Sequence, residues 1–167
     1  AWTAHPRLNP AFEPTDRKTF DIGRAAHRAV LGRGGDYVAY PADLLASNGA
    51  ASTKEAKAWA EDRRAEGRTP LKADEVDQIG DMADAVQRQL AAMGIRLDPA
   101  RSEVVALAEV DGVACRAMID NAPADPRQPL YDLKTTMDAS PEALAKTVAS
   151  YGYDLQAAHY LAAWKAA

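Results

Sequence analysis

The chain has 167 residues, of which 47% are hydrophobic and 26% are charged, and its formal net charge is −4. This balance favours one globular domain. The negative charge excludes a uniformly basic nucleic-acid-binding surface, but not a local basic groove or a DNA site that uses a bound cation. The single cysteine, Cys115, excludes an intramolecular disulfide and a cysteine zinc cluster. No apolar run approaches the roughly 20 residues of a membrane span, so we expect a cytoplasmic protein without a membrane partner.

Apolar residues at helical spacing predict three helices in the first part of the chain. They cover residues 15–32, 52–67 and 73–94. The second helix is strongly charged and is expected to open with a capping box from Ser52 to Glu55. A short strand is expected over residues 37–40.

The next part of the chain changes to strand patterns. Residues 102–110 and 113–122 flank the turn pair Asp111-Gly112, which predicts a β-hairpin. The segment LYDLKTT, residues 130–136, reads as a third and buried strand.

Two helices complete the chain. Ser140 is a good N-cap for a helix over residues 141–150, and a final helix is expected over residues 154–166. The order of elements predicts a mixed α/β (α+β) fold in which a small sheet is flanked by helices. Because the chain lacks an initial Met and ends in a helical pattern, we expect residues 1–167 to form a single domain, excerpted from a longer protein and trimmed at both ends.

Two charged residues in the third predicted strand need an explanation, because charges rarely enter a strand core unless they are paired, bind a metal or do chemistry. Side chains alternate across a strand, so Asp132 and Lys134 are expected on one face. If neighbouring strands bring Asp120 close, the carboxylates suit Mg²⁺ or Mn²⁺. Lys134 would then stabilise charge that develops on a phosphate.

Each of these residues also has a structural interpretation. Asp132 and Lys134 could form a solvated ion pair, and Asp120 could be a turn residue at a strand end. His27, on an apolar helix face, could be a hydrogen-bonded core histidine. Gln156 and Tyr160 could be ordinary helix-packing residues.

The order and spacing of several motifs resemble the PD-(D/E)xK nuclease superfamily. Asp120 followed by Asp132-Leu133-Lys134 resembles its acidic and D-x-K motifs. Gly23 and His27 are similar to the G-x-x-x-H motif of the RecB-type branch. Gln156 and Tyr160 are similar to that branch's Q-x-x-x-Y motif, and Glu103 opens the first strand, where the family often has a glutamate. Within the branch, the sequence around these motifs most resembles phage and prophage exonucleases of the RecE, or exodeoxyribonuclease VIII, type.

The resemblance implies a restriction-endonuclease-like core and a set of site residues. The residues implied as metal ligands are His27, Asp120, Asp132 and the Leu133 carbonyl. The residues implied in catalysis are Asp120, Asp132, Lys134, Gln156, Tyr160 and Glu103, with Lys134 as the catalytic lysine. The family domain normally continues into further strands after the Q-x-x-x-Y helix, which are not in this sequence.

The activity that the resemblance implies is a Mg²⁺- or Mn²⁺-dependent exodeoxyribonuclease that degrades linear double-stranded DNA from its ends. Its setting would be phage or prophage recombination in the cytoplasm of a bacterial or phage-infected cell. A single-strand annealing protein and a homo-oligomeric ring are the partners expected. Two alternatives stay open: a catalytically silent module that binds DNA or a partner, and a RecB-like endonuclease or nuclease module of a larger machine.

Overall fold

A computed structural model describes residue 11 and residues 18–167 of the chain. The first part of the described chain forms three helices and a small parallel sheet. Its elements are α1 (Lys18–Leu31), β1 (Tyr37–Ala39), the short 3₁₀ helix η2 (Ala42–Leu44), α2 (Lys54–Ala65), β2 (Thr69–Leu71) and α3 (Ala73–Ala92). The predicted helices are confirmed here, although residues 15–17 of the first lie outside the described residues.

The second part of the chain forms a hairpin followed by two helices. Its elements are the 3₁₀ helix η3 (Pro99–Arg101), β3 (Ser102–Val110), β4 (Val113–Asn121), α4 (Pro141–Tyr151) and α5 (Tyr153–Ala166). β3 and β4 pair antiparallel, with Val110 opposite Val113. The turn residues Asp111 and Gly112 both have positive φ, 51° and 77°, as the predicted Asp-Gly turn requires.

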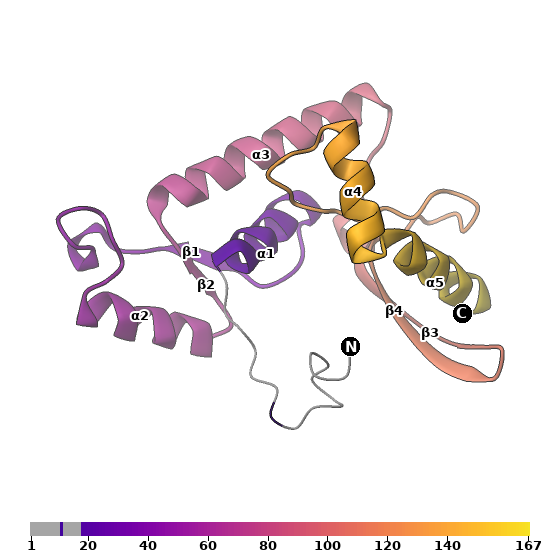
Figure 1. The fold of residues 1–167 in the computed structure, drawn as a ribbon, viewed down its shortest axis with the longest axis horizontal. Helices are drawn as coiled ribbons and strands as arrows, with labels where there is room; N and C mark the ends of the chain where they lie inside the picture. Colours follow the sequence, from indigo (N-terminus) through magenta and orange to yellow (C-terminus); the bar gives the residue numbers. More distant parts are fainter. Residues whose placement is uncertain (1–10, 12–17) are drawn as a thin grey trace.

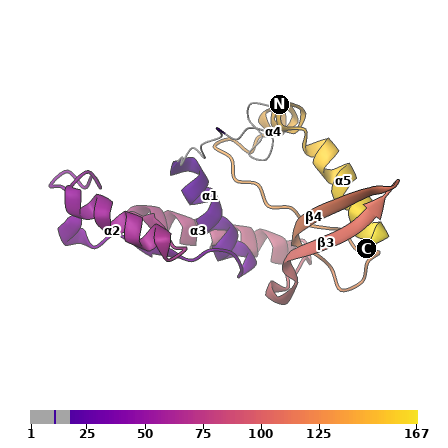
Figure 2. The same cartoon turned by 90° about the horizontal axis from the view of Figure 1, so that it is seen from below.

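The two parts of the molecule, which lie on the left and right of Figure 1, have separate apolar cores. In the first part, α1 packs against α3 and β2 around Ala25, Leu71 and Ile79. In the second, α5 packs across the hairpin around Ala117, Ile119 and Ala163, among other residues. Figure 2 shows the hairpin and α5 together on the side away from α2. None of the described helices is both long enough and apolar enough to cross a membrane.

Two local predictions for the first part need correction. The cap of α2 is Thr53 and not Ser52, because the Thr53 side chain accepts the hydrogen bond from the Ala56 amide over 3.0 Å. The strand over residues 69–71 had not been predicted, since it has only three residues and contains Pro70. It pairs in parallel with β1, in the register Val38 opposite Pro70.

The predicted third strand over residues 130–136 is wrong. Only Tyr131 makes a strand-like bridge, in which its amide and carbonyl exchange hydrogen bonds of 3.0 and 3.1 Å with Asn121. The Leu133 amide then bonds to the Asp120 side chain, so the ladder stops. The sheet is therefore a two-stranded hairpin with an extended segment beside its end. The fold class remains mixed α+β as predicted, with two small sheets flanked by helices.

Candidate functional site

Asp120 lies at the end of β4 and is 8% exposed. Its Oδ2 atom accepts a hydrogen bond of 2.7 Å from the Leu133 main-chain amide. Burial raises the pKa of Asp120, because a charged carboxylate loses hydration there. The Leu133 amide and the nearby His27 oppose that rise, whereas the charge of Asp132 adds to it.

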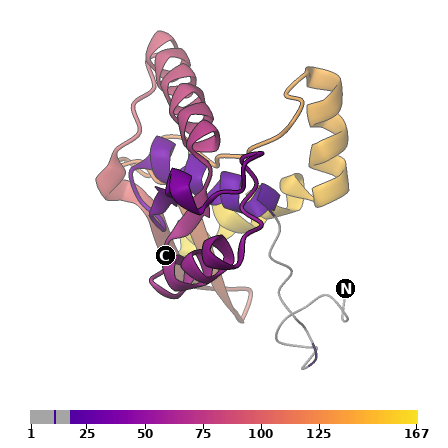
Figure 3. The same ribbon diagram turned by 90° about the vertical axis from the view of Figure 1, so that its left-hand side faces the viewer.

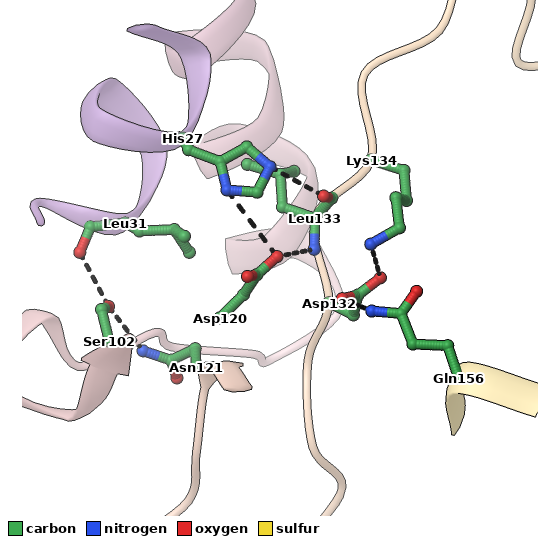
Figure 4. Close-up of polar contacts among 9 residues, drawn as sticks. All are labelled: His27, Leu31, Ser102, Asp120, Asn121, Asp132, Leu133, Lys134 and Gln156. Carbon is green, nitrogen blue, oxygen red and sulfur yellow. Dashed lines mark hydrogen bonds and ion pairs between the residues drawn. The ribbon is translucent and has the colours of Figure 1, made fainter. Parts of the chain in front are cut away.

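His27 comes from the middle of α1 and reaches the same place. Its Nε2 atom lies 2.9 Å from the Leu133 carbonyl oxygen, so a hydrogen bond there makes Nε2 the protonated nitrogen. Its Nδ1 atom lies 3.8 Å from Asp120 Oδ2. Leu133 is therefore held through both main-chain polar groups, the amide by Asp120 and the carbonyl by His27 (Figure 4).

The Leu133 side chain anchors the segment as well. It packs against the apolar cluster of Val30, Leu31 and Ala83, which joins α1 to α3. Because neighbouring side chains in extended backbone point to opposite sides, Asp132 and Lys134 face away from this cluster. One hydrophobic contact thus sets the direction in which the two charged side chains project.

Asp132 and Lys134 form an ion pair on the exposed side of this segment. The other Asp132 oxygen, Oδ1, accepts a hydrogen bond of 3.2 Å from Gln156 Nε2 on α5. About a third of each charged side chain is exposed, 35% for Asp132 and 33% for Lys134, so both are accessible to a ligand from solvent. We call the side chains of His27, Asp120, Asp132, Lys134 and Gln156, with the Leu133 main chain, the polar cluster.

Two candidates from the sequence are not joined to the polar cluster by a hydrogen bond or ion pair among the described residues. Tyr160 packs beside the hairpin core, against the cluster that contains Ile119 and Ala163. Glu103 has a positive φ of 53°, and its Oε1 would lie 3.1 Å from a Cβ atom added at Gly34, in the loop after α1. A residue other than glycine rarely adopts a positive φ, and this backbone conformation of Glu103 costs roughly 1 kcal/mol or more.

The structure adds supporting residues that the sequence did not suggest. Ser102 Oγ donates to the Leu31 carbonyl over 2.8 Å and accepts from Asn121 Nδ2 over 3.0 Å. These buried bonds tie the start of β3 and the end of β4 to the last turn of α1, which fixes Asp120 relative to His27. The sequence offered one signal for these supporting residues: Ser102 and Asn121 are polar residues at the ends of two apolar strands.

The chemistry of the donors in the polar cluster suits a hard divalent cation. Two carboxylates and a main-chain carbonyl are oxygen ligands of the kind that Mg²⁺ and Mn²⁺ take, and the imidazole adds a nitrogen that Mn²⁺ accepts more readily. In the part of the chain that the structure describes, no three His, Cys, Asp or Glu side chains are preformed as a metal site. Asp132 is engaged by Lys134 and Gln156 instead, so a cation would compete with these partners.

Comparison with known proteins gives one family. The chain matches, over residues 3–167, the model of a PDDEXK-like domain of unknown function (DUF3799). This match spans α1, the hairpin, the segment after it and α5, and therefore every element that contributes to the polar cluster. No curated protein and no solved structure matches the chain.

Proposed function

Because the chain belongs to the family of PDDEXK-like domains described as DUF3799, we propose that it is a metal-dependent nuclease that hydrolyses phosphodiester bonds in DNA. The family match supports a nuclease-type fold. The observation that carries the proposal is the polar cluster, where Asp120 and His27 hold the Leu133 main chain and leave Asp132 paired with Lys134.

In this proposal the cation is Mg²⁺ or Mn²⁺, and its ligands are Asp120, Asp132, His27 and the Leu133 carbonyl. Such an ion, when bound, stabilises negative charge on a phosphate and lowers the pKa of coordinated water. Two contacts bring these groups together, and they leave His27 Nδ1, which is unprotonated when Nε2 donates to Leu133, as the ring nitrogen available to a cation. The Leu133 carbonyl and His27 Nε2 face each other, and the Asp120 carboxylate lies against the other ring nitrogen.

Lys134 and Gln156 act on the substrate side of the polar cluster in our proposal. If Asp132 held a cation, Lys134 would be released from its ion pair, and its ammonium would be available to stabilise negative charge on a phosphate in the transition state. Gln156 orients Asp132 through its amide, as the 3.2 Å hydrogen bond indicates. We assign Tyr160 and Glu103 supporting roles, through packing of α5 on the hairpin and through the loop after α1.

The finer assignment rests on the sequence motifs. The resemblance to RecE-type enzymes supports an exonuclease that acts on linear double-stranded ends, in phage or prophage recombination. A single-strand annealing partner, a ring-shaped oligomer and the cytoplasm of a bacterial or phage-infected cell belong to the same proposal.

The test is digestion of end-labelled linear duplex DNA and of closed circular DNA of the same sequence, each with Mg²⁺, with Mn²⁺ and with a chelator. We expect metal-dependent release of label from linear DNA and an intact circle. Cutting of the circle at the same rate would favour the endonuclease alternative. DNA binding without any cutting in either metal would contradict catalysis and favour the silent binding module.

A further inference from the structure

Two tyrosines lie on either side of the single residue that separates α4 from α5. Tyr151 ends α4 and Tyr153 begins α5, and their rings stack with centroids 5.7 Å apart and planes inclined by 18°. Gly152 has φ 65° and ψ 40°, the left-handed conformation that glycine adopts without strain. The sharp turn at this glycine brings the two rings together.

This aromatic pair touches the polar cluster. The Lys134 ammonium lies 5.1 Å from the centroid of the Tyr153 ring, within the range of a cation–π contact. The same ammonium pairs with Asp132, and the Asp132 carboxylate is bonded by Gln156, one helical turn along α5 from Tyr153. A continuous set of contacts therefore leads from the proposed metal ligand to the aromatic rings.

The outer ring of the pair is open to solvent. Tyr151 is 74% exposed, so core packing does not explain its position. α4 packs chiefly on α5, and Figure 3 shows it standing apart from α2 and α3. A planar group from solvent could therefore approach the Tyr151 ring.

We propose that Tyr151 and Tyr153 form a stacking platform for an unpaired base at the end of the DNA, an inference that rests on the proposed nuclease function. Every nucleobase has a flat face that stacks on an aromatic ring, largely irrespective of sequence. A base held there would lie at the outer end of the row of contacts that leads through Tyr153 to Lys134 and Asp132. The substrate of this site would then be a frayed or overhanging end rather than a fully paired one.

A protein partner is the other conceivable occupant, because Leu155 beside the platform is 72% exposed. The contact with Lys134 favours DNA instead. An apolar partner covering Tyr153 would remove water from a charged lysine and its aspartate without supplying new bonds, which is costly. A nucleotide offers a stacking face and a phosphate together.

The test compares two substitutions at the exposed ring, Tyr151→Leu, which removes the aromatic face, and Tyr151→Phe, which keeps it. Binding is measured by fluorescence anisotropy in chelator, so that no cutting intervenes. One duplex has an unpaired terminal nucleotide, and the other has an abasic residue at the same position. We expect the wild-type protein and Tyr151→Phe to prefer the duplex with the base by about tenfold, as stacking on one aromatic side chain typically allows, and Tyr151→Leu to lose that preference.

Three results would count against the platform. Equal wild-type affinity for the two duplexes overturns it and leaves the nuclease proposal standing, which is judged by the metal-dependent digestion. A Tyr151→Leu protein that keeps the preference overturns it too, and points to the partner-protein role of this surface. Absence of any DNA binding by the wild-type chain in chelator at low salt would also overturn the platform, whereas the nuclease proposal is still judged by the metal-dependent digestion.

Discussion

The main-chain amide of Leu133 donates to Asp120 Oδ2 over 2.7 Å, so a side chain at the end of β4 takes the place of a strand partner. This bond ends the ladder after Tyr131 and turns the following segment toward α1. There the Leu133 carbonyl meets His27, and the Leu133 side chain enters the core between α1 and α3. The polar cluster therefore depends on one residue whose amide, carbonyl and side chain each have a separate partner.

Replacement of the lysine of the polar cluster tests its role in catalysis. We expect Lys134→Met to lower the rate of DNA hydrolysis by roughly a hundred- to a thousandfold, because it removes the charge that we propose stabilises the transition state. Its ion pair is about a third exposed, so we expect an unchanged thermal unfolding midpoint. Lys146→Met, at an exposed position of α4, is the matched control and should leave the rate unchanged. Equal activity of Lys134→Met and the wild type would contradict the assigned role.

The role of the α1 histidine can be measured without any DNA. Because His27 contributes an imidazole beside the Leu133 carbonyl, we expect His27→Ala to weaken Mn²⁺ binding by at least about tenfold, as measured by calorimetry. His159→Ala is the control, since His159 is exposed and its ring contacts the Arg116 carbonyl, at 3.2 Å, and the Tyr160 ring. Identical Mn²⁺ affinities of the two variants would remove His27 from the ligand set.

Substitution of Asp120 should separate stability from activity. Burial raises the pKa of Asp120 in the folded protein, so its contribution to stability is fully present below the unfolded pKa and is lost as the pH rises through the folded pKa. At a pH above the folded pKa, the metal-free protein therefore carries an unfavourable buried charge. We expect Asp120→Asn, whose amide oxygen can still accept from the Leu133 amide, to melt at a higher temperature than the wild type at neutral pH while losing DNA hydrolysis. A lower melting temperature, measured by calorimetry without metal, would show that the carboxylate is needed for folding.

Asp21 should have the opposite dependence on pH. This residue on α1 is 5% exposed. Burial by itself raises the pKa of Asp21, but bonds from Arg64, at 2.8 and 3.3 Å, and from Arg24 outweigh it and hold the pKa below its usual value. Because the pKa of Asp21 is lowered, its contribution to stability is present above the unfolded pKa. This contribution is lost as the pH falls through the folded pKa.

We therefore expect Arg64→Met to destabilise the protein at neutral pH by about 1–3 kcal/mol, because Asp21 stays buried with fewer partners, and to reduce the loss of stability on acidification. Urea unfolding at several pH values measures both effects. Arg127→Met is the control, since its pair with Asp125 is solvent-exposed and should not change the midpoint. A wild-type-like pH profile for Arg64→Met would contradict the assigned role of this buried pair.

Two glycine substitutions should change stability in opposite directions. Gly152 has a φ of 65° at the junction of α4 and α5, so Gly152→Ala is expected to lower the free energy of unfolding by about 1 kcal/mol. Gly80 lies inside α3 with nothing within 4 Å of an added Cβ, so Gly80→Ala is expected to raise it by roughly 0.5–1 kcal/mol. Chemical denaturation of the two variants in parallel measures both changes. Stabilisation by Gly152→Ala would show that the turn tolerates a side chain.

Much of the fold could be predicted because its signals are local. Ser140 and Pro141 start α4 where expected, and the Asp111-Gly112 turn sets the hairpin register. The face shared by Asp132 and Lys134 follows from alternation in any extended segment, so their pairing was one of the alternatives that the sequence left open, even though the predicted strand was wrong. Capping, helical periodicity and turn chemistry each involve residues a few positions apart, and a sequence displays them directly.

The path of the chain after Tyr131 was decided only by the tertiary structure. The segment LYDLKTT, residues 130–136, looks like a strand, but whether it pairs depends on what competes for its amides, and here Asp120 takes the amide of Leu133. The contact of His27 with the Leu133 carbonyl joins residues 106 positions apart, and the meeting of Lys134 with Tyr153 depends on how α5 packs across the hairpin. The sequence by itself determined which side chains were available and on which faces they lie. Long-range packing between α1, the hairpin and α5 determined which of them meet, because hydrogen bonds and burial depend on distances in space that local patterns do not encode.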